Sequence, residues 1–119
     1  SRKASDYGIT SAAAVSTQLA ECGMTIVSGC ALGVDSAAHM GALRAGGKTV
    51  GVAACGLNVD YPSGNHPLRE DIIKSGVMIS EFPLNTPPLA YNFPKRNRMP
   101  LISFRSSVSL ELLSELRHW

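Results

Sequence analysis

The segment from Phe93 to Arg98 holds the densest group of residues that could bind a ligand. Its sequence, Phe-Pro-Lys-Arg-Asn-Arg, places three cations within four residues, next to an aromatic ring and an amide. Every charged residue between Phe82 and Leu110 is basic. A core does not tolerate such unpaired charge, although a solvated loop would. Guanidinium groups beside an aromatic ring suit phosphates and unstacked bases, so the segment predicts a nucleotide or nucleic-acid site.

A glycine-containing turn is a second candidate for anion binding. It reads Ser28-Gly29-Cys30-Ala31-Leu32-Gly33-Val34-Asp35 and joins an apolar run to a helical pattern. Its small residues would let backbone N–H groups approach an anion at a helix N-terminus. The G-x-x-x-G spacing, with no Lys-Ser or Lys-Thr after it, argues against a dinucleotide fingerprint or a P-loop. The alternative is a tight turn with Asp35 as the N-cap of the helix, and both interpretations stay open.

Further polar and reactive residues follow two other apolar runs. Cys55 could be a nucleophile, but no histidine lies in a recognisable arrangement with it, so we favour packing. Glu81 could be a general base; we favour a role in holding a basic side chain or a loop backbone. The three histidines show no metal-ligand spacing, and His39 is expected to be packed or half-exposed within a helix.

Composition narrows the class of protein. The chain has 119 residues, 45% of them hydrophobic, which fits one domain with a core. A net charge of +2 means that anion binding must come from local clusters. Cys22, Cys30 and Cys55 are odd in number and show no C-x-x-C spacing, so they predict free thiols in a reducing cytosol. No apolar run is long enough to span a bilayer.

The elements that position these residues alternate between helix and strand. Helices are expected over Ile9–Glu21, Ser36–Ala45 and Pro67–Lys74, and strands over Met24–Ser28, Thr49–Ala54 and Val77–Ser80. This alternation predicts an α/β fold with a parallel sheet and right-handed connections. Such sheets bind ligands at the carboxyl ends of their strands, where the glycine turn, Cys55 and Glu81 would meet.

Arg2 and Lys3 would join this edge if a strand ended just before Ser1. The chain opens on a Ser-Arg-Lys turn without a methionine, so we expect a fragment, with a natural start after processing as the alternative. Arg2 would then line one cationic pocket together with Arg96 and Arg98. A frayed, solvated terminus is the competing interpretation.

Five groups of residues occur in the order found in one family. They are Ser1-Arg2; Ser28-Gly29-x-Ala31-x-Gly33-Val34-Asp35; Cys55-Gly56-Leu57 with Tyr61-Pro62 and Asn65; Glu81-Phe82-Pro83; and Phe93-Pro94-x-Arg96-Asn97-Arg98. Over residues 1–99 the chain therefore resembles the bacterial DNA-processing protein A family (DprA/Smf). Each motif is weak alone, but their shared order is specific.

The resemblance implies a Rossmann-like three-layer αβα sandwich with a mostly parallel sheet, whose first and terminal strands would be missing or altered here. It also implies a cytoplasmic homodimer without catalytic activity, cofactor, metal or membrane anchor. Such a protein binds and protects single-stranded DNA in natural transformation (competence) and DNA recombination, and loads a RecA-type recombinase.

The family's positive pocket can be carried over onto matching residues of this chain. The implied DNA-binding residues are Arg2, Lys3, Ser28, Gly29, Gly33, Phe82, Phe93, Lys95, Arg96, Asn97 and Arg98. Residues expected to shape the pocket are Asp35, Cys55, Gly56, Tyr61, Asn65 and Glu81.

The resemblance stops after Met99, which predicts a domain over 1–99 and a divergent tail over 100–119. Leu110, Leu113 and Leu116 recur at helical spacing, so the tail could form a short helix. A frameshift or a truncated gene would explain the change. Two other functions stay open: a phosphoribohydrolase-like nucleotide enzyme, which lacks support because no Pro-Gly-Gly-x-Gly-Thr turn is present, and a non-functional remnant.

Overall fold

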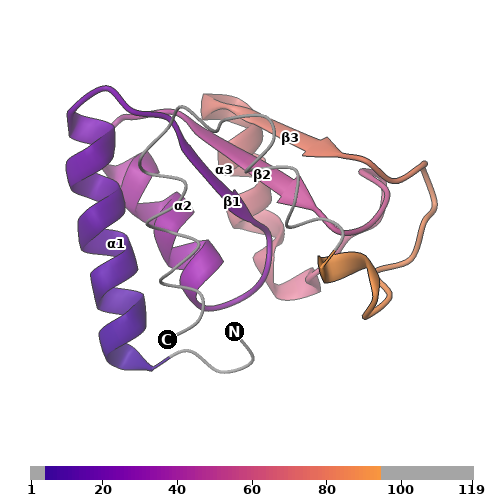
Figure 1. The fold of residues 1–119 in the computed structure, drawn as a ribbon. Coiled ribbons are helices and arrows are strands. Elements are labelled where there is room, and N and C mark those ends of the chain that lie inside the picture. The colour runs from indigo at the N-terminus through magenta and orange to yellow at the C-terminus, as the bar shows by residue number, and fades with distance from the viewer. Residues whose placement is uncertain (1–4, 95–119) are drawn as a thin grey trace.

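The computed structural model describes residues 5–94 and shows an α/β fold (Figure 1). Its elements, in chain order, are α1 (Asp6–Glu21), β1 (Ile26–Gly29), α2 (Val34–Arg44), β2 (Thr49–Ala53), a short 3-10 turn (Ser63–Asn65), α3 (His66–Ser75) and β3 (Val77–Ser80). All six predicted helices and strands are present. The first strand begins at Ile26 rather than Met24, and the second helix begins at Val34 rather than Ser36.

Helix α1 packs closely against α2 because both helices present small residues at their contact. Ser5 caps α1: its Oγ accepts a hydrogen bond from the backbone N–H of Gly8 at 3.0 Å. A Cβ added to Gly41 of α2 would lie 2.5 Å from the backbone oxygen of Ala13 in α1. The two helices and β1 share one core cluster, formed by Ala12, Ala20, Ile26, Val34, Ala37, Ala38 and Ala42.

The described strands form a parallel sheet in the order β1-β2-β3, and their arrowheads point the same way in Figure 1. Side chains alternate between the two faces. Val27 pairs with Val50 on one face, where Val27, Val50 and Val52 form a second core cluster. Ile26 pairs with Thr49 on the face covered by α2 and α3. The predicted parallel sheet is therefore confirmed.

His39 of α2 connects that helix to two strands. Its Nε2 lies 2.7 Å from the carbonyl oxygen of Gly29, so Nε2 must donate. Its Nδ1 lies 2.6 Å from Oγ1 of Thr49, which in turn lies 2.9 Å from the carbonyl oxygen of Ile26. The ring is buried, so the packed alternative of the sequence prediction is confirmed and the half-exposed one is wrong.

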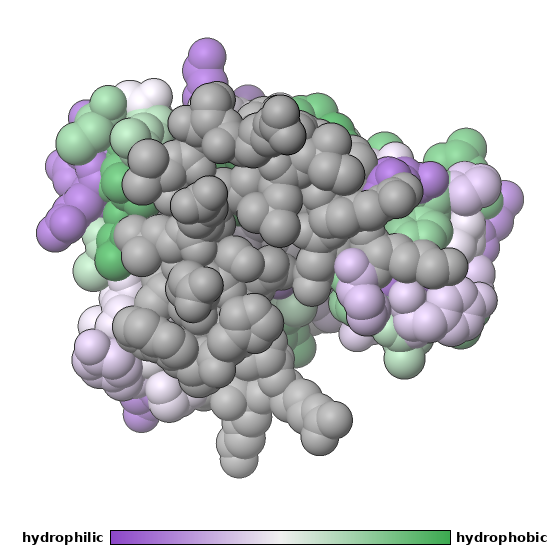
Figure 2. All heavy atoms as spheres, viewed as in Figure 1, coloured by the Kyte–Doolittle hydropathy of each residue, from purple (hydrophilic) through white to green (hydrophobic). Residues whose placement is uncertain are grey.

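Within residues 5–94, no helix is long and apolar enough to cross a membrane. On the face shown in Figure 2, hydrophobic and hydrophilic residues are interspersed over the coloured part of the surface.

Candidate functional site

The carboxyl ends of the three strands meet at one edge of the sheet, which we call the carboxyl edge. The β1–α2 turn (residues 29–33), the β2–α3 loop (residues 54–65) and the segment after β3 (residues 81–94) all begin there. The structure brings together at this edge the predicted residues Ser28, Gly29, Gly33, Asp35, Cys55, Gly56, Tyr61, Asn65, Glu81, Phe82 and Phe93. Arg2, Lys3, Lys95, Arg96, Asn97 and Arg98 lie outside the described residues.

The β1–α2 turn is held from inside by a buried carboxylate. Oδ1 of Asp35 accepts a hydrogen bond from Ser28 Oγ at 2.8 Å, and Oδ2 accepts one from the backbone N–H of Ala31 at 3.3 Å. The N-cap position belongs to Gly33, with φ 88° and ψ −121°, a conformation that favours glycine. The predicted capping role of Asp35 is therefore wrong, because this residue lies inside the first turn of α2 and bonds backward to the strand.

The same turn is tied to the β2–α3 loop through Asn65. Ser36 Oγ donates to the carbonyl oxygen of Ala31 at 2.9 Å, and Asn65 Nδ2 donates to Ser36 Oγ at 2.7 Å. The backbone N–H of Ala31 is used by Asp35, so this amide is not free to bind an anion. Anion binding by the rest of the turn stays a prediction.

The start of the β2–α3 loop is packed rather than reactive. Cys55 is buried, and desolvation raises the pKa of its thiol above 9.0, although the Arg69 guanidinium acts in the opposite direction. A neutral, buried thiol is a poor nucleophile, which agrees with the packing role favoured from the sequence. The segment after β3 packs closely against Gly56, where a side chain would not fit: an added Cβ would lie 2.7 Å from both Asn85 N and Pro83 O.

Arg69 is a residue that sequence analysis missed. Its Nη1 donates to the carbonyl oxygen of Val59 at 2.7 Å, and its Nη2 donates to that of Leu57. It thereby fixes the loop that carries Tyr61. Among the described lysines and arginines, Arg44, Lys48 and Lys74 lie at the opposite, amino edge of the sheet, where α2 and α3 end and β2 begins. Arg69 is the described cation nearest the site.

Asn92, also missed, docks the segment after β3 onto the carboxyl edge. Its side chain is 2% exposed, and its Nδ2 donates to Ala54 O at 3.2 Å and to Pro87 O at 3.0 Å. Ser80 Oγ supports the start of the segment by donating to Cys55 O at 2.7 Å and accepting from Phe82 N at 3.0 Å. Glu81 is exposed. Its role in holding a basic side chain or a loop backbone stays a prediction.

Two aromatic rings meet where these segments converge. The ring centroids of Tyr61 and Phe93 lie 6.0 Å apart at an interplanar angle of 66°, an edge-to-face arrangement. Phe93 is half-buried, whereas Tyr61 is exposed. This contact brings the ring before the cationic segment onto the β2–α3 loop.

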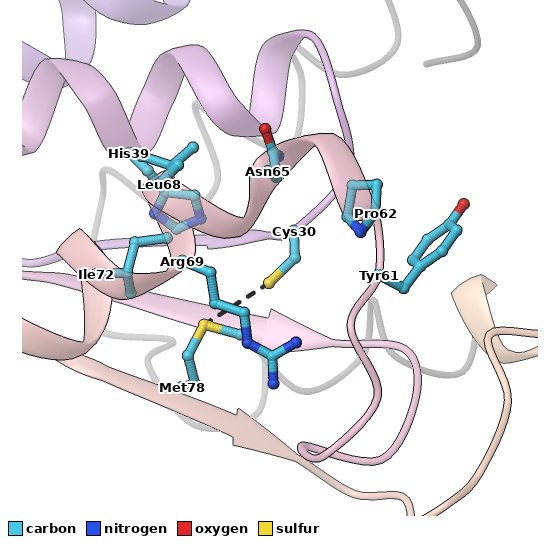
Figure 3. Close-up of a pocket in the computed structure, with 9 residues that line it drawn as sticks. All are labelled: Cys30, His39, Tyr61, Pro62, Asn65, Leu68, Arg69, Ile72 and Met78. Atoms are coloured by element: carbon cyan, nitrogen blue, oxygen red, sulfur yellow. Dashed lines mark hydrogen bonds between the residues drawn. The ribbon is translucent and has the colours of Figure 1, made fainter.

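A small cavity opens beside Tyr61, between the β1–α2 turn and α3 (Figure 3). Its volume is about 10 Å³, room for about one water and not for a nucleotide. The lining residues are Cys30, His39, Tyr61, Pro62, Asn65, Leu68, Arg69, Ile72 and Met78. No group of three or more His, Cys, Asp or Glu side chains in residues 5–94 is placed to hold a metal ion.

Comparison with protein families finds a match to the family of DNA recombination-mediator protein A over residues 1–108. This span runs past Met99, and the domain boundary at 99 stays a prediction. The chain is 46% identical over 82 residues to protein Smf of Escherichia coli, covering 68% of this chain and 22% of the relative. It is 46% identical over 76 residues to DNA processing protein DprA of Streptococcus pneumoniae, covering 64% and 27%.

Two solved structures share the fold. DNA processing protein A from Streptococcus pneumoniae matches with a TM-score of 0.73 and 42% identity, over 83% of this chain and 35% of that one. The protein from Helicobacter pylori, solved for its single-stranded DNA binding mode, matches with a TM-score of 0.74 and 33% identity, over 83% and 45%. The chain thus spans less than half the length of these proteins.

Proposed function

Because the chain belongs to the family of DNA recombination-mediator protein A, we propose that it binds single-stranded DNA at the carboxyl edge of its sheet. The observation that carries the proposal is the docking of Phe93 at this edge through Asn92. The cations Lys95, Arg96 and Arg98 follow within five residues. The relative from Helicobacter pylori, which was solved for its single-stranded DNA binding mode, supports the same ligand.

In this proposal phosphates and bases are bound by different residues. Arg2, Lys95, Arg96 and Arg98 neutralise phosphates, and the Phe93 ring stacks on a base. Stacking is worth about 1–3 kcal/mol per base and tolerates any sequence. The Gly29–Gly33 turn and Phe82 shape the wall of the site. Stacking on Phe93 requires a base that is not paired in a duplex, so the proposed ligand is single-stranded.

The protein acts by binding and not by catalysis in this proposal. At the proposed site, the buried thiol of Cys55 and the cavity of about 10 Å³ beside Tyr61 offer little to a nucleotide-processing reaction. Protection of DNA, loading of a RecA-type recombinase, a homodimeric state and a cytoplasmic location are further parts of the proposal, supported by family membership.

The test is a fluorescence-anisotropy titration of an oligo-dT and of a duplex at two salt concentrations. We expect tighter binding to the single strand. Arg96→Ala and Arg2→Ala should each weaken binding and flatten the slope of log affinity against log salt by about 0.7 per lost phosphate contact. Arg44→Ala is the matched control, because Arg44 lies at the amino edge. Unchanged affinity in folded Arg96→Ala would refute the site, and equal affinity for duplex would refute the function.

A further inference from the structure

Tyr61 makes the contact with Phe93 from a different element, across the β2–α3 loop. From this contact we infer that Tyr61 is a positioning residue, which holds the Phe93 ring in the orientation that receives an unpaired nucleobase. The inference rests on the proposed DNA-binding function and goes beyond it, because neither composition nor family motif assigns Tyr61 more than a general part in shaping the pocket.

The backbone of Phe93 is fixed, but its side chain needs a separate support. The side chain of Asn92, the residue before Phe93, donates hydrogen bonds to the carbonyl oxygens of Ala54 and Pro87. The backbone N–H of Phe93 donates to Ala90 O at 3.3 Å. These bonds set where the Cα lies. The ring is only half-buried, so rotation about its side-chain torsions must be limited by neighbouring groups.

Tyr61 can serve as that neighbour because its own loop is clamped on both sides. Arg69 holds the carbonyl oxygen of Val59 at 2.7 Å, and the backbone N–H of Asn65 donates to the carbonyl oxygen of Pro62 at 2.9 Å. Figure 3 shows the Tyr61 ring at the edge of the cavity, with its hydroxyl directed away from the other lining residues. The backbone on both sides of Tyr61 is thus held, and its ring lies against Phe93.

The angle of the contact matters for the ligand. At 66° the rings meet edge to face, so they do not stack on one another as parallel plates. The contact therefore bears on the orientation of the Phe93 ring without a parallel overlap of the two rings. In the proposed function this ring stacks on a nucleobase that is free of pairing and stacking partners.

The experiment compares the wild-type chain with Tyr61→Leu and Tyr61→Phe, using an oligo-dT that carries one 2-aminopurine. Base stacking on a protein ring changes 2-aminopurine fluorescence, and the salt slope reports phosphate contacts separately. We expect Tyr61→Leu to weaken binding about three- to tenfold and to reduce the fluorescence change, with the salt slope unchanged. Tyr61→Phe keeps the ring and should behave as wild type.

A double-mutant cycle with Phe93→Leu separates positioning from general damage. If Tyr61 acts through Phe93, the double variant should bind no more weakly than Phe93→Leu alone. Additive losses, or a Tyr61→Leu variant that matches wild type in affinity and fluorescence, would overturn the inference while wild-type binding to single strands still upholds the proposed function. Absence of wild-type binding would overturn both.

Discussion

At the scale of single residues, Cys55 shows that a thiol at the carboxyl edge can be packed and unreactive. The side chain is buried, and the backbone carbonyl oxygen of Cys55 accepts a hydrogen bond from Ser80 Oγ at 2.7 Å. Burial favours its neutral form and raises its pKa, with Arg69 as the smaller opposing influence. The consequence is a pH dependence of stability with a defined sign.

We expect the free energy of unfolding to fall as pH rises above about 9, and Cys55→Ala to lack this part of the fall. The unfolded chain ionises Cys55 near its ordinary pKa of 9.0, whereas the folded protein keeps the proton to higher pH. Above that pH the unfolded state therefore binds fewer protons and gains stability. Urea unfolding of both proteins from pH 7.5 to 10.5 measures the effect. A difference between the two that stays constant across this range would contradict it.

Thiol alkylation at pH 8 gives an independent measure of the same burial. Cys22 is exposed and serves as the internal control, whereas Cys55 is buried. Cys22 should be modified first, and Cys55 only as the chain unfolds. Cys55 modified as fast as Cys22 in the folded protein would argue against the packing role.

At the scale of elements, the link between β1 and α2 depends on Asp35. This carboxylate is 3% exposed and satisfies one hydroxyl and one backbone N–H of the segment that joins the two elements. The turn that we propose as a wall of the DNA site is thus held by the helix that follows it. Its shape is determined by hydrogen bonds rather than by glycine content alone.

Asp35→Ala should lower the free energy of unfolding by about 1–3 kcal/mol, because it leaves the Ala31 N–H and the Ser28 hydroxyl without this acceptor. Asp35→Asn should lose less, since an amide can accept from Ala31 and donate to Ser28. Asp71→Ala, at an exposed carboxylate of α3, is the control and should stay within about 0.5 kcal/mol of wild type. Urea denaturation of the three variants decides the matter. Equal stability of Asp35→Ala and Asp71→Ala would show that the link is dispensable.

The order of elements could be predicted because its signals are local. Thr49 to Ala53 is a short apolar run, and Ala12, Val15, Leu19 and Ala20 recur at helical spacing. The role of Asp35 could not be predicted in the same way. Whether an aspartate caps a helix or lies within its first turn depends on the positive φ of Gly33 and on the contact with Ser28.

Side chains that join distant segments were also beyond prediction. Asn92 bonds to a carbonyl group 38 residues earlier, and a polar residue in a proline-rich loop normally faces solvent. Arg69 binds carbonyl oxygens 10 and 12 residues away, and no pattern in the sequence marks those partners. The candidate residues of the site were predicted from their types and from the family resemblance, whereas the contacts that hold the described ones in place required the fold.

At the scale of the whole molecule, the parallel sheet separates two ends with different character. Loops of the carboxyl edge carry the aromatic pair and lead to the cationic segment, whereas Arg44, Lys48 and Lys74 gather where the helices end at the amino edge. Within the described residues, cations lie at the amino edge and, as Arg69, beside the carboxyl edge, so charge alone does not locate a polyanion. Base stacking distinguishes them, because the described ring pair lies at the carboxyl edge.

We therefore expect hydrogen–deuterium exchange to show a one-sided footprint of bound oligo-dT. Amides of residues 29–33, 54–61 and 81–94 should exchange more slowly in the complex, since the ligand covers these loops and limits their opening. Amides of residues 44–48 and 74–76 at the amino edge should exchange at the rate of the free protein and act as the internal control. A duplex of the same length, which carries more phosphate charge but no unpaired bases, tests whether the footprint needs unpaired bases. Protection of both edges to the same degree would mean that the DNA is bound by charge alone, and that the carboxyl edge is not the site.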